Sequence, residues 1–243
     1  MRIHCLTTGV VRPKARPRGV RRWLPGGWAD ETLPVNAFAI EHDGGVFLFD
    51  TGQEARAAEP GYFPRWQPFF WLSRFELDRD DEVAAQLPSL GIEPTSVRWV
   101  VLSHLHTDHV GGLAPFTRAG VFVSRLEWDR ARGFAGRLRG YVPERWPRGL
   151  VPRLVDLDGP PIGPFPGSHD LYGDGRLVLV ATPGHTPGHL SLVARGTQRG
   201  FLLGGDLARS PEELPSDVAD FCRREGLAYL GAHDPDAPAL AES

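Results

Sequence analysis

Three histidines and an aspartate stand within six residues of one another in the segment HLHTDH, which spans positions 104–109. Imidazole and carboxylate groups are ligands of borderline-soft divalent ions such as Zn²⁺. The apolar run at 99–102, which is typical of a buried strand, precedes the segment, and Gly111-Gly112 follows it. If the strand continues through His106, the rings of His104 and His106 point to the same side. Asp108 and His109 then approach from another direction, an arrangement that favours two neighbouring metal ions over one.

Three later apolar runs also end at potential ligands. His185 follows residues 177–181, Asp206 follows residues 201–203 and His233 follows residues 227–230, each beside glycine or proline. A strand-end aspartate by itself is a common turn residue. The repetition behind four buried strands nevertheless predicts one site assembled on the rigid scaffold of a sheet.

The order of these motifs, HxHxDH, TPGHTPGH, GGD and a late AHDP, resembles that of the metallo-β-lactamase superfamily of binuclear hydrolases. The resemblance extends over roughly residues 33–233. It implies an α/β fold, a four-layer αββα sandwich, and we expect residues 1–243 to form a single domain. It also implies a ligand set of His104, His106 and His185 for one metal ion, Asp108, His109 and His233 for the other, and Asp206 as the bridge.

Other polar residues have supporting or no roles by the same resemblance. Asp50, in the run FDTG, matches a strand-end aspartate that supports the metal site. His189 is expected to be structural or to contact a ligand from outside. His4, His42 and His169 match no ligand position, so we expect them to be surface or packing residues.

Two divalent ions, expected to be Zn²⁺, would lower the pKa of a shared water to near neutrality and supply hydroxide for attack on an ester-like carbonyl. Asp108 would carry the proton from the attack to the leaving group. Within the superfamily the motifs are most similar to those of N-acyl-homoserine lactonases, so the leading hypothesis is a hydrolase of a small lactone. Those lactonases have a tyrosine three residues after the bridging aspartate, where this chain has Arg209. Arg209 is a candidate catalytic residue that stabilises an oxyanion, binds a substrate carboxylate or points to solvent.

Several alternatives share the first motif. A thioesterase of glyoxalase II type would carry a Cys-Gly-Arg segment after the bridging aspartate, and this chain has none. A phosphodiesterase or nuclease would normally carry further domains or a basic arm. A non-catalytic metal-binding module would not need so complete a set of ligands.

The composition sets further limits. A net charge of −3 gives no general attraction to nucleic acid or to anionic membranes, so we expect neither as a partner. Mean hydropathy of −0.25, no secretion signal and no apolar run long enough to span a bilayer predict a cytoplasmic protein. Cys5 and Cys222 cannot form a disulfide framework. A homodimer is one oligomeric state that the sequence allows.

The apolar pattern predicts alternating strands and helices. We expect strands at 3–7, 35–41, 46–49 and 121–123, with a hairpin turn at 43–45. Helices are expected at 80–87 and 211–225, and Ser124 and Glu127 would form a capping box at the start of another helix. Residues 133–147 would form an irregular or helical insertion over the active-site face.

Two segments fall outside this pattern. Residues 62–75 contain seven aromatic side chains, which either pack onto the domain or another subunit or form an apolar wall near the metals. Residues 12–22 contain a cluster of cations that either bind an anionic group or form a solvated loop.

Overall fold

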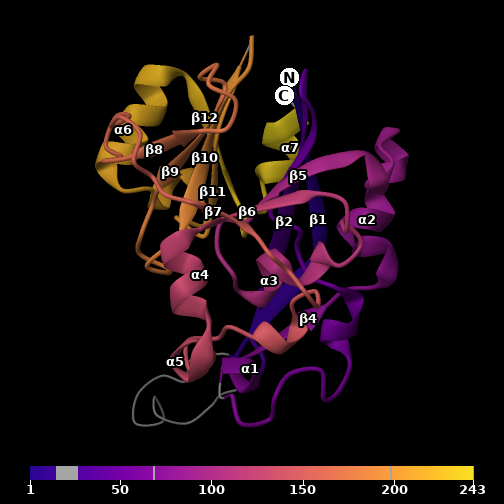
Figure 1. Ribbon diagram of the computed structural model, residues 1–243. Coiled ribbons are helices and arrows are strands. Elements are labelled where there is room, and N and C mark those ends of the chain that lie inside the picture. Colours follow the sequence, from indigo (N-terminus) through magenta and orange to yellow (C-terminus); the bar gives the residue numbers. More distant parts are fainter. Residues whose placement is uncertain (15–26, 68, 198, 243) are drawn as a thin grey trace.

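The computed structural model describes residues 1–14, 27–67, 69–197 and 199–242. Two β-sheets pack face to face in it, and helices cover their outer surfaces (Figure 1). The first sheet has the strand order β4-β1-β2-β3-β5-β6-β7, and the second has the order β12-β11-β10-β9-β8.

The first sheet is antiparallel from β4 to β3 and parallel from β3 to β7. Its strands are β1 (Arg2–Pro13), β2 (Leu33–His42), β3 (Gly45–Phe49), β4 (Ser73–Glu76), β5 (Val97–Val101), β6 (Gly120–Ser124) and β7 (Arg153–Val155). The second sheet is antiparallel except for the parallel pair β11 and β12. Its strands are β8 (Ser168–Asp170), β9 (Leu177–Ala181), β10 (Leu190–Arg195), β11 (Gly200–Gly205) and β12 (Leu227–Gly231).

The helices of the described residues are short. The α-helices are α1 (Phe69–Leu72), α2 (Val83–Gln86), α3 (Thr107–Val110), α4 (Arg125–Ala131), α5 (Gly133–Arg137), α6 (Ser216–Glu225) and α7 (Ala237–Glu242). The 3₁₀ turns are η2 (Ala55–Ala58), η3 (Arg79–Asp81), η4 (Leu87–Leu90), η5 (Pro94–Ser96), η6 (Gly111–Leu113), η7 (Pro143–Arg145) and η8 (Pro211–Glu213). None of these helices is long and apolar enough to cross a membrane.

Side-chain alternation along the strands builds three apolar layers. In β2, Phe38 and Ile40 point between the sheets, where they join Leu179 and Leu192 of the second sheet. Ala37 and Ala39, one residue out of phase, face the helices that cover the first sheet. The far side of the second sheet packs against Val218, Phe221 and Cys222 of α6. The order helix, sheet, sheet, helix confirms the predicted αββα sandwich.

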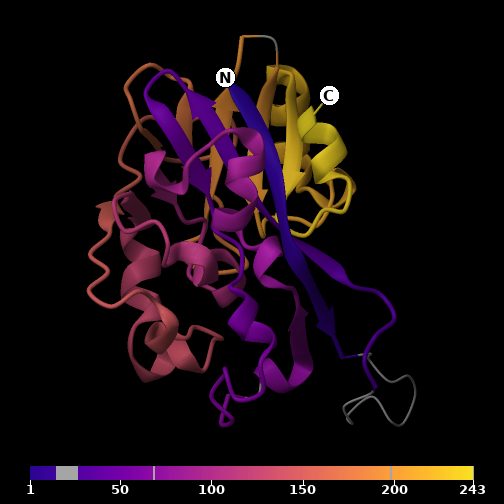
Figure 2. The same cartoon turned by 90° about the vertical axis from the view of Figure 1, so that its right-hand side faces the viewer.

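Strand β1 is much longer than the expected strand at 3–7. Figure 2 shows it as a long indigo ribbon that begins near the N-terminus and runs diagonally across the molecule. Its pairing with β2 shifts register between Thr7 and Val10, and Val10–Pro13 then pairs with β4. Gly9 lies in this bulge with a φ of 79°, where a Cβ would approach the carbonyl oxygen of Glu76 to 2.5 Å. Beyond the bulge, Val11 of β1 lines the same cavity as the candidate ligands His106 and Asp108.

Two predicted helices are interrupted. The prediction of one continuous helix at 80–87 is wrong, because the backbone of Glu82 is extended between η3 and α2. The Glu82 carboxylate accepts a hydrogen bond from the backbone N–H of Ala55 at 2.9 Å, an interaction that competes with a continuous helix. The helix expected at 211–225 begins instead at Ser216. Its first part is a separate turn, η8, since Pro215 favours an extended conformation for Leu214 before it.

The predicted capping box is half right. The Ser124 hydroxyl accepts a hydrogen bond from the backbone N–H of Glu127, as expected for the start of α4. The Glu127 side chain, however, does not return to Ser124 and points into the interior, where it contacts other loops. The hairpin between β2 and β3 is confirmed, and both cysteines are free thiols.

Only the first part of the basic segment at 12–22 can be placed, because residues 15–22 lie outside the described residues. Arg12 makes two hydrogen bonds to the Glu76 carboxylate, at 2.7 and 3.1 Å, and a third to the carbonyl of Ala29. Lys14 lies over the ring of Trp28 at 3.8 Å. These two cations therefore join β1 to its neighbours.

Candidate metal centre

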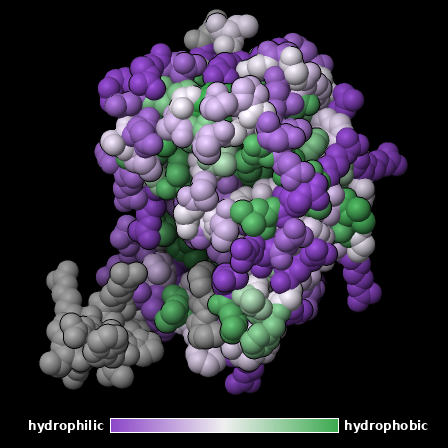
Figure 3. Space-filling model, turned by 60° about the vertical axis from the view of Figure 1, so that its left-hand side comes forward, coloured by the Kyte–Doolittle hydropathy of each residue, from purple (hydrophilic) through white to green (hydrophobic). Residues whose placement is uncertain are grey.

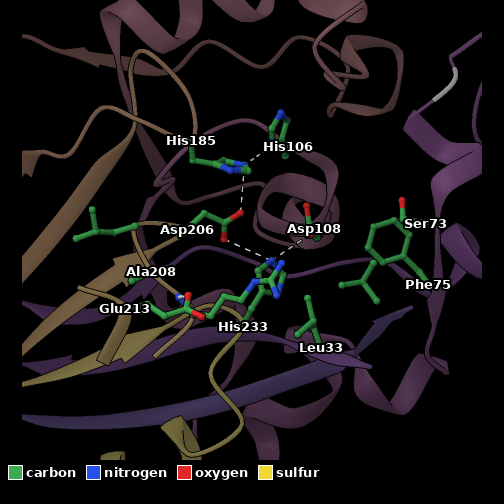
Figure 4. A pocket seen from close by; sticks show the side chains of 13 residues that line it. Leu33, Ser73, Phe75, His106, Asp108, His185, Asp206, Ala208, Glu213 and His233 are labelled. Atoms are coloured by element: carbon green, nitrogen blue, oxygen red, sulfur yellow. Dashed lines mark hydrogen bonds and ion pairs between the residues drawn. The ribbon is translucent and has the colours of Figure 1, made fainter. Parts of the chain in front are cut away.

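All seven predicted ligands converge in one place, between the ends of strands from both sheets. Figure 4 shows five of them, His106, Asp108, His185, Asp206 and His233. His185, Asp206 and His233 follow β9, β11 and β12 as predicted. The prediction that a strand continues through His106 is wrong, because β5 ends at Val101. His104 and His106 lie on the loop between β5 and α3, and their rings converge because this loop turns toward the second sheet.

One group of ligand atoms consists of three imidazole nitrogens. Nδ1 of His106 lies 3.0 Å from Nε2 of His104 and 2.9 Å from Nε2 of His185. Oδ2 of Asp206 lies 3.2 Å from Nε2 of His185 and 3.9 Å from Nε2 of His104. Three nitrogens and one oxygen thus surround a common space.

A second group faces the other oxygen of the same aspartate. Oδ1 of Asp206 lies 3.2 Å from Nε2 of His109 and 3.4 Å from Nε2 of His233. Oδ2 of Asp108 lies 3.7 Å from Nε2 of His233, and Oδ1 of Asp108 lies 3.9 Å from Nε2 of His109. Each group therefore has donor atoms from four residues, and Asp206 contributes one oxygen to each.

These spacings fit two metal ions. Tetrahedral ligands about 2.1 Å from Zn²⁺ lie roughly 3.4 Å from one another, which falls within the measured range of 2.9–3.9 Å. Nε2 of His109 and Oδ1 of Asp206 are buried atoms without a hydrogen-bond partner, although they face each other. Buried polar atoms are rarely left in that state. A cation between them would satisfy both.

Burial and nearby charges shift the histidine pKa values in opposite directions in the two groups. Burial, together with the neighbouring rings, lowers the pKa of His104 well below its usual range and that of His106 to about 4. These rings are therefore neutral at pH 7, the form that binds metal ions. In the second group burial opposes charge, but the Asp206 carboxylate prevails and raises the pKa of His233 to about 9. The same negative charge favours a metal ion at these nitrogens, in competition with protons.

Asp50 orients the second group from behind, as the resemblance implied. Its carboxylate accepts hydrogen bonds from Nδ1 of His109 at 2.8 Å and from the backbone N–H and hydroxyl of Ser103 at 2.7 and 2.8 Å. Holding Nδ1–H in this way leaves Nε2 of His109 facing the site. Asp50 has a φ of 61°, the one positive value at a non-glycine residue in the described ranges. This strained backbone conformation places the Asp50 carboxylate beside Nδ1 of His109.

His189 supports the bridging aspartate and is not among the seven converging ligands. Its Nε2 accepts a hydrogen bond from the backbone N–H of Asp206 at 3.0 Å, and its Nδ1 lies 2.8 Å from the hydroxyl of Thr182. Burial lowers the pKa of His189 to about 3, which keeps the accepting nitrogen free of a proton. These contacts agree with the structural role expected for His189.

A cavity of about 360 Å³ opens beside the ligands. Figure 4 shows Asp108, His106, His185 and Asp206 on one side of it and Leu33 and Phe75 on the other. Figure 3 shows one face of the molecule hollowed, with hydrophobic side chains in the hollow. The size is that of a small-molecule site. The lining residues are Val11, Leu33, Ser73, Phe75, His106, Asp108, His185, Asp206, Leu207, Ala208, Arg209, Glu213 and His233.

Arg209 is exposed at the rim of this cavity, and its backbone N–H donates to the Glu213 carboxylate at 3.3 Å. The aromatic segment combines both roles considered for it. Phe75 lines the cavity, while Trp66 and Trp71 are 48% and 60% exposed and do not line it. The packing part of the segment comprises Tyr62, Phe63 and Phe70, whose rings contact one another.

Sequence reasoning missed several residues around the ligands. The carbonyl of Arg139 accepts a hydrogen bond from Nε2 of His106 at 3.0 Å, and the Tyr141 ring lies 4.9 Å from the His106 ring. Both belong to the insertion at 133–147, for which only a position over the site was expected. Glu127 and Gln67 hold this insertion in place. No local pattern marks these contacts, because the partners are far apart in the sequence.

The pattern that defines the metallo-beta-lactamase superfamily matches residues 30–243. The chain is similar to curated proteins named N-acyl homoserine lactonase AttM. Identity is 31% to the protein from Azorhizobium caulinodans and 33% to that from Rhizobium radiobacter, and in both cases the match covers 98% of this chain and 94% of the relative.

Solved structures have the same fold. An N-acyl homoserine lactone hydrolase with the product N-hexanoyl-L-homoserine at its catalytic metal centre superimposes with a TM-score of 0.71 at 20% identity, over 98% of this chain and 95% of that one. The dizinc quorum-quenching lactonase AidC superimposes with a TM-score of 0.59 at 17% identity, over 96% and 87% of the two chains. With the ligand order, the fold and these relatives in agreement, the chain belongs to the metallo-beta-lactamase superfamily.

Proposed function

We propose that this protein is a metal-dependent hydrolase that opens small lactones, with N-acyl-homoserine lactones as the leading substrate class. One observation carries the proposal: two groups of donor atoms share Asp206 at the side of a cavity that the apolar side chains of Leu33 and Phe75 also line. The AttM relatives, at 31–33% identity over nearly the whole chain, support the choice of lactones within the superfamily.

The seven ligands would hold two divalent cations, which we propose to be Zn²⁺. When bound, such ions supply Lewis acidity at a carbonyl oxygen and a nucleophile at neutral pH. Asp108 faces the cavity as well as His233, so it is placed to take a proton during attack and to return it to the departing alkoxide. We propose this role in addition to its role as a ligand.

Arg209 is the proposed substrate-binding cation. Its position at the cavity rim suits contact with an oxyanion during attack or with the carboxylate formed when the ring opens. Leu33 and Phe75 would contact the acyl chain. A single domain, a cytoplasmic location and a homodimer remain further proposals, and none of them enters the chemistry.

The test compares hydrolysis of N-acyl-homoserine lactones, a glutathione thioester and a phosphodiester by the metal-loaded protein. We expect turnover of the lactones and a loss of at least 100-fold in kcat for Asp108→Asn, by the usual magnitude of general acid–base catalysis, about 10²–10⁴. Asp129→Asn, at an exposed ion pair with Arg132, is the matched control and should keep full activity. Turnover of the phosphodiester or thioester with inert lactones would refute the substrate class.

A further inference from the structure

Glu127 is a fully buried carboxylate with 0% exposure, close to the ligand-bearing loops. Oε1 accepts hydrogen bonds from the backbone N–H of Leu105 at 3.1 Å and from the hydroxyl of Tyr141 at 2.8 Å. Oε2 accepts one from the hydroxyl of Thr186 at 2.8 Å. No ion pair to Glu127 is found among the described residues, so three neutral donors compensate the buried charge. Such an arrangement is costly unless every contact is well made.

Each of the three donors is tied to a ligand of the three-histidine group. Leu105 stands between His104 and His106, and Thr186 directly follows His185. Tyr141 packs its ring against that of His106. One carboxylate thus connects the loop after β5, the loop after β9 and the insertion at 133–147, which share no strand pairing at this point.

The surroundings restrict movement of this connection. The side chain of Gln67 is buried and donates from Nε2 to the carbonyls of Arg137 and Tyr141 at 2.6 and 3.0 Å, so it holds the insertion at two further points. At Gly188 a Cβ would lie 2.2 Å from the backbone nitrogen of Glu127. Only glycine allows the loop after His185 to approach α4 so closely.

We propose that Glu127 is a positioning residue that holds His106 and His185 in register for a metal ion in the three-histidine group. The inference rests on the proposed function, since it assumes that two metal ions bind. The two groups differ in their supports, because the Asp50 carboxylate holds His109 of the second group directly, whereas the donors to Glu127 adjoin or contact His104, His106 and His185. Loss of Glu127 should therefore weaken one metal site and leave the second.

The test measures metal content after equilibration with a graded series of chelator concentrations. Glu127→Gln keeps the size of the side chain and removes its charge, whereas Tyr141→Phe removes one donor and keeps the ring. We expect each variant to lose one metal ion per chain at a chelator concentration about 10- to 100-fold lower than the parent requires. This is the usual effect of removing residues that support metal ligands. Tyr172→Phe, at an exposed tyrosine that stacks on His42, is the control and should match the parent.

Thermal unfolding of metal-free and metal-loaded protein distinguishes positioning from general stability. If Glu127 positions ligands, the rise in Tm on metal loading is smaller in Glu127→Gln than in the parent. Equal losses of Tm in both forms, with both metal ions retained as in the parent, would overturn the inference. A parent protein that binds fewer than two metal ions would instead refute the proposed function.

Discussion

Replacing Leu33 by alanine shortens an apolar side chain that lines the same cavity as Asp108. Leu33 is half-buried at the start of β2, where it pairs with Val11, so much of its surface remains for a ligand to cover. The substitution should therefore affect substrates that reach this side chain and spare those that occupy only the space beside the metal ligands.

The size of the effect follows from the buried surface. Leucine to alanine removes three carbon atoms, and burial of one methylene contributes about 0.8 kcal/mol. If a substrate chain covers about half of this surface, the loss is about 1.2 kcal/mol, or roughly eightfold in kcat/KM. A lactone without an acyl chain should lose less than twofold, since this side chain lies beyond its reach.

The assay measures kcat/KM for γ-butyrolactone and for N-acyl-homoserine lactones of increasing chain length, in the parent and in Leu33→Ala. Trp66→Ala serves as the control, because Trp66 is large, apolar and exposed and does not line the cavity. An equal loss for all lactones, or an equal effect of Trp66→Ala, would refute the reasoning.

Three further predictions concern Asp50, Arg209 and Cys5. Asp50→Asn should weaken binding of one metal ion by about 10- to 100-fold through lost control of His109, as measured by chelator competition; unchanged binding would contradict this. Arg209→Ala should lower kcat/KM by about 10- to 150-fold, since hydrogen bonds to charged groups contribute about 1.5–3 kcal/mol; an activity equal to the parent's would assign Arg209 to solvent. Burial and the charge of Asp234 raise the pKa of the Cys5 thiol to about 12. Folding therefore favours the protonated thiol, and its contribution to the free energy of unfolding is present below pH 9 and is lost as pH rises from 9 toward 12. Iodoacetamide should not label Cys5 at pH 8 before unfolding, as judged by mass spectrometry, and rapid labelling would contradict the assigned pKa.

The ligand residues could be predicted because they follow apolar strands, and strand ends bring distant residues together at one edge of a sheet. His185, Asp206 and His233 illustrate this, since each follows its strand in the expected place. The rings of His104 and His106 converge for a different reason, a turn of the loop after β5. The local pattern of residues does not define that turn.

The supporting contacts could not be predicted for a related reason. Glu127 stands three residues after Ser124, a spacing that favours a capping box, but donors from three distant loops compete for its carboxylate. The local sequence pattern predicts only the capping interaction between Ser124 and Glu127. Likewise β1 continues beyond the bulge at Gly9 to Val11, which lines the cavity, because it pairs with strands far apart in the chain.

Anomalous diffraction at the zinc absorption edge, from crystals of the protein purified with Zn²⁺, tests the central claim most directly. Two peaks about 3.5–4 Å apart, one beside His104, His106 and His185 and the other beside His109 and His233, with Asp206 between them, are the predicted result. A single peak, or none beside Asp206, would contradict the assignment of a two-metal hydrolase.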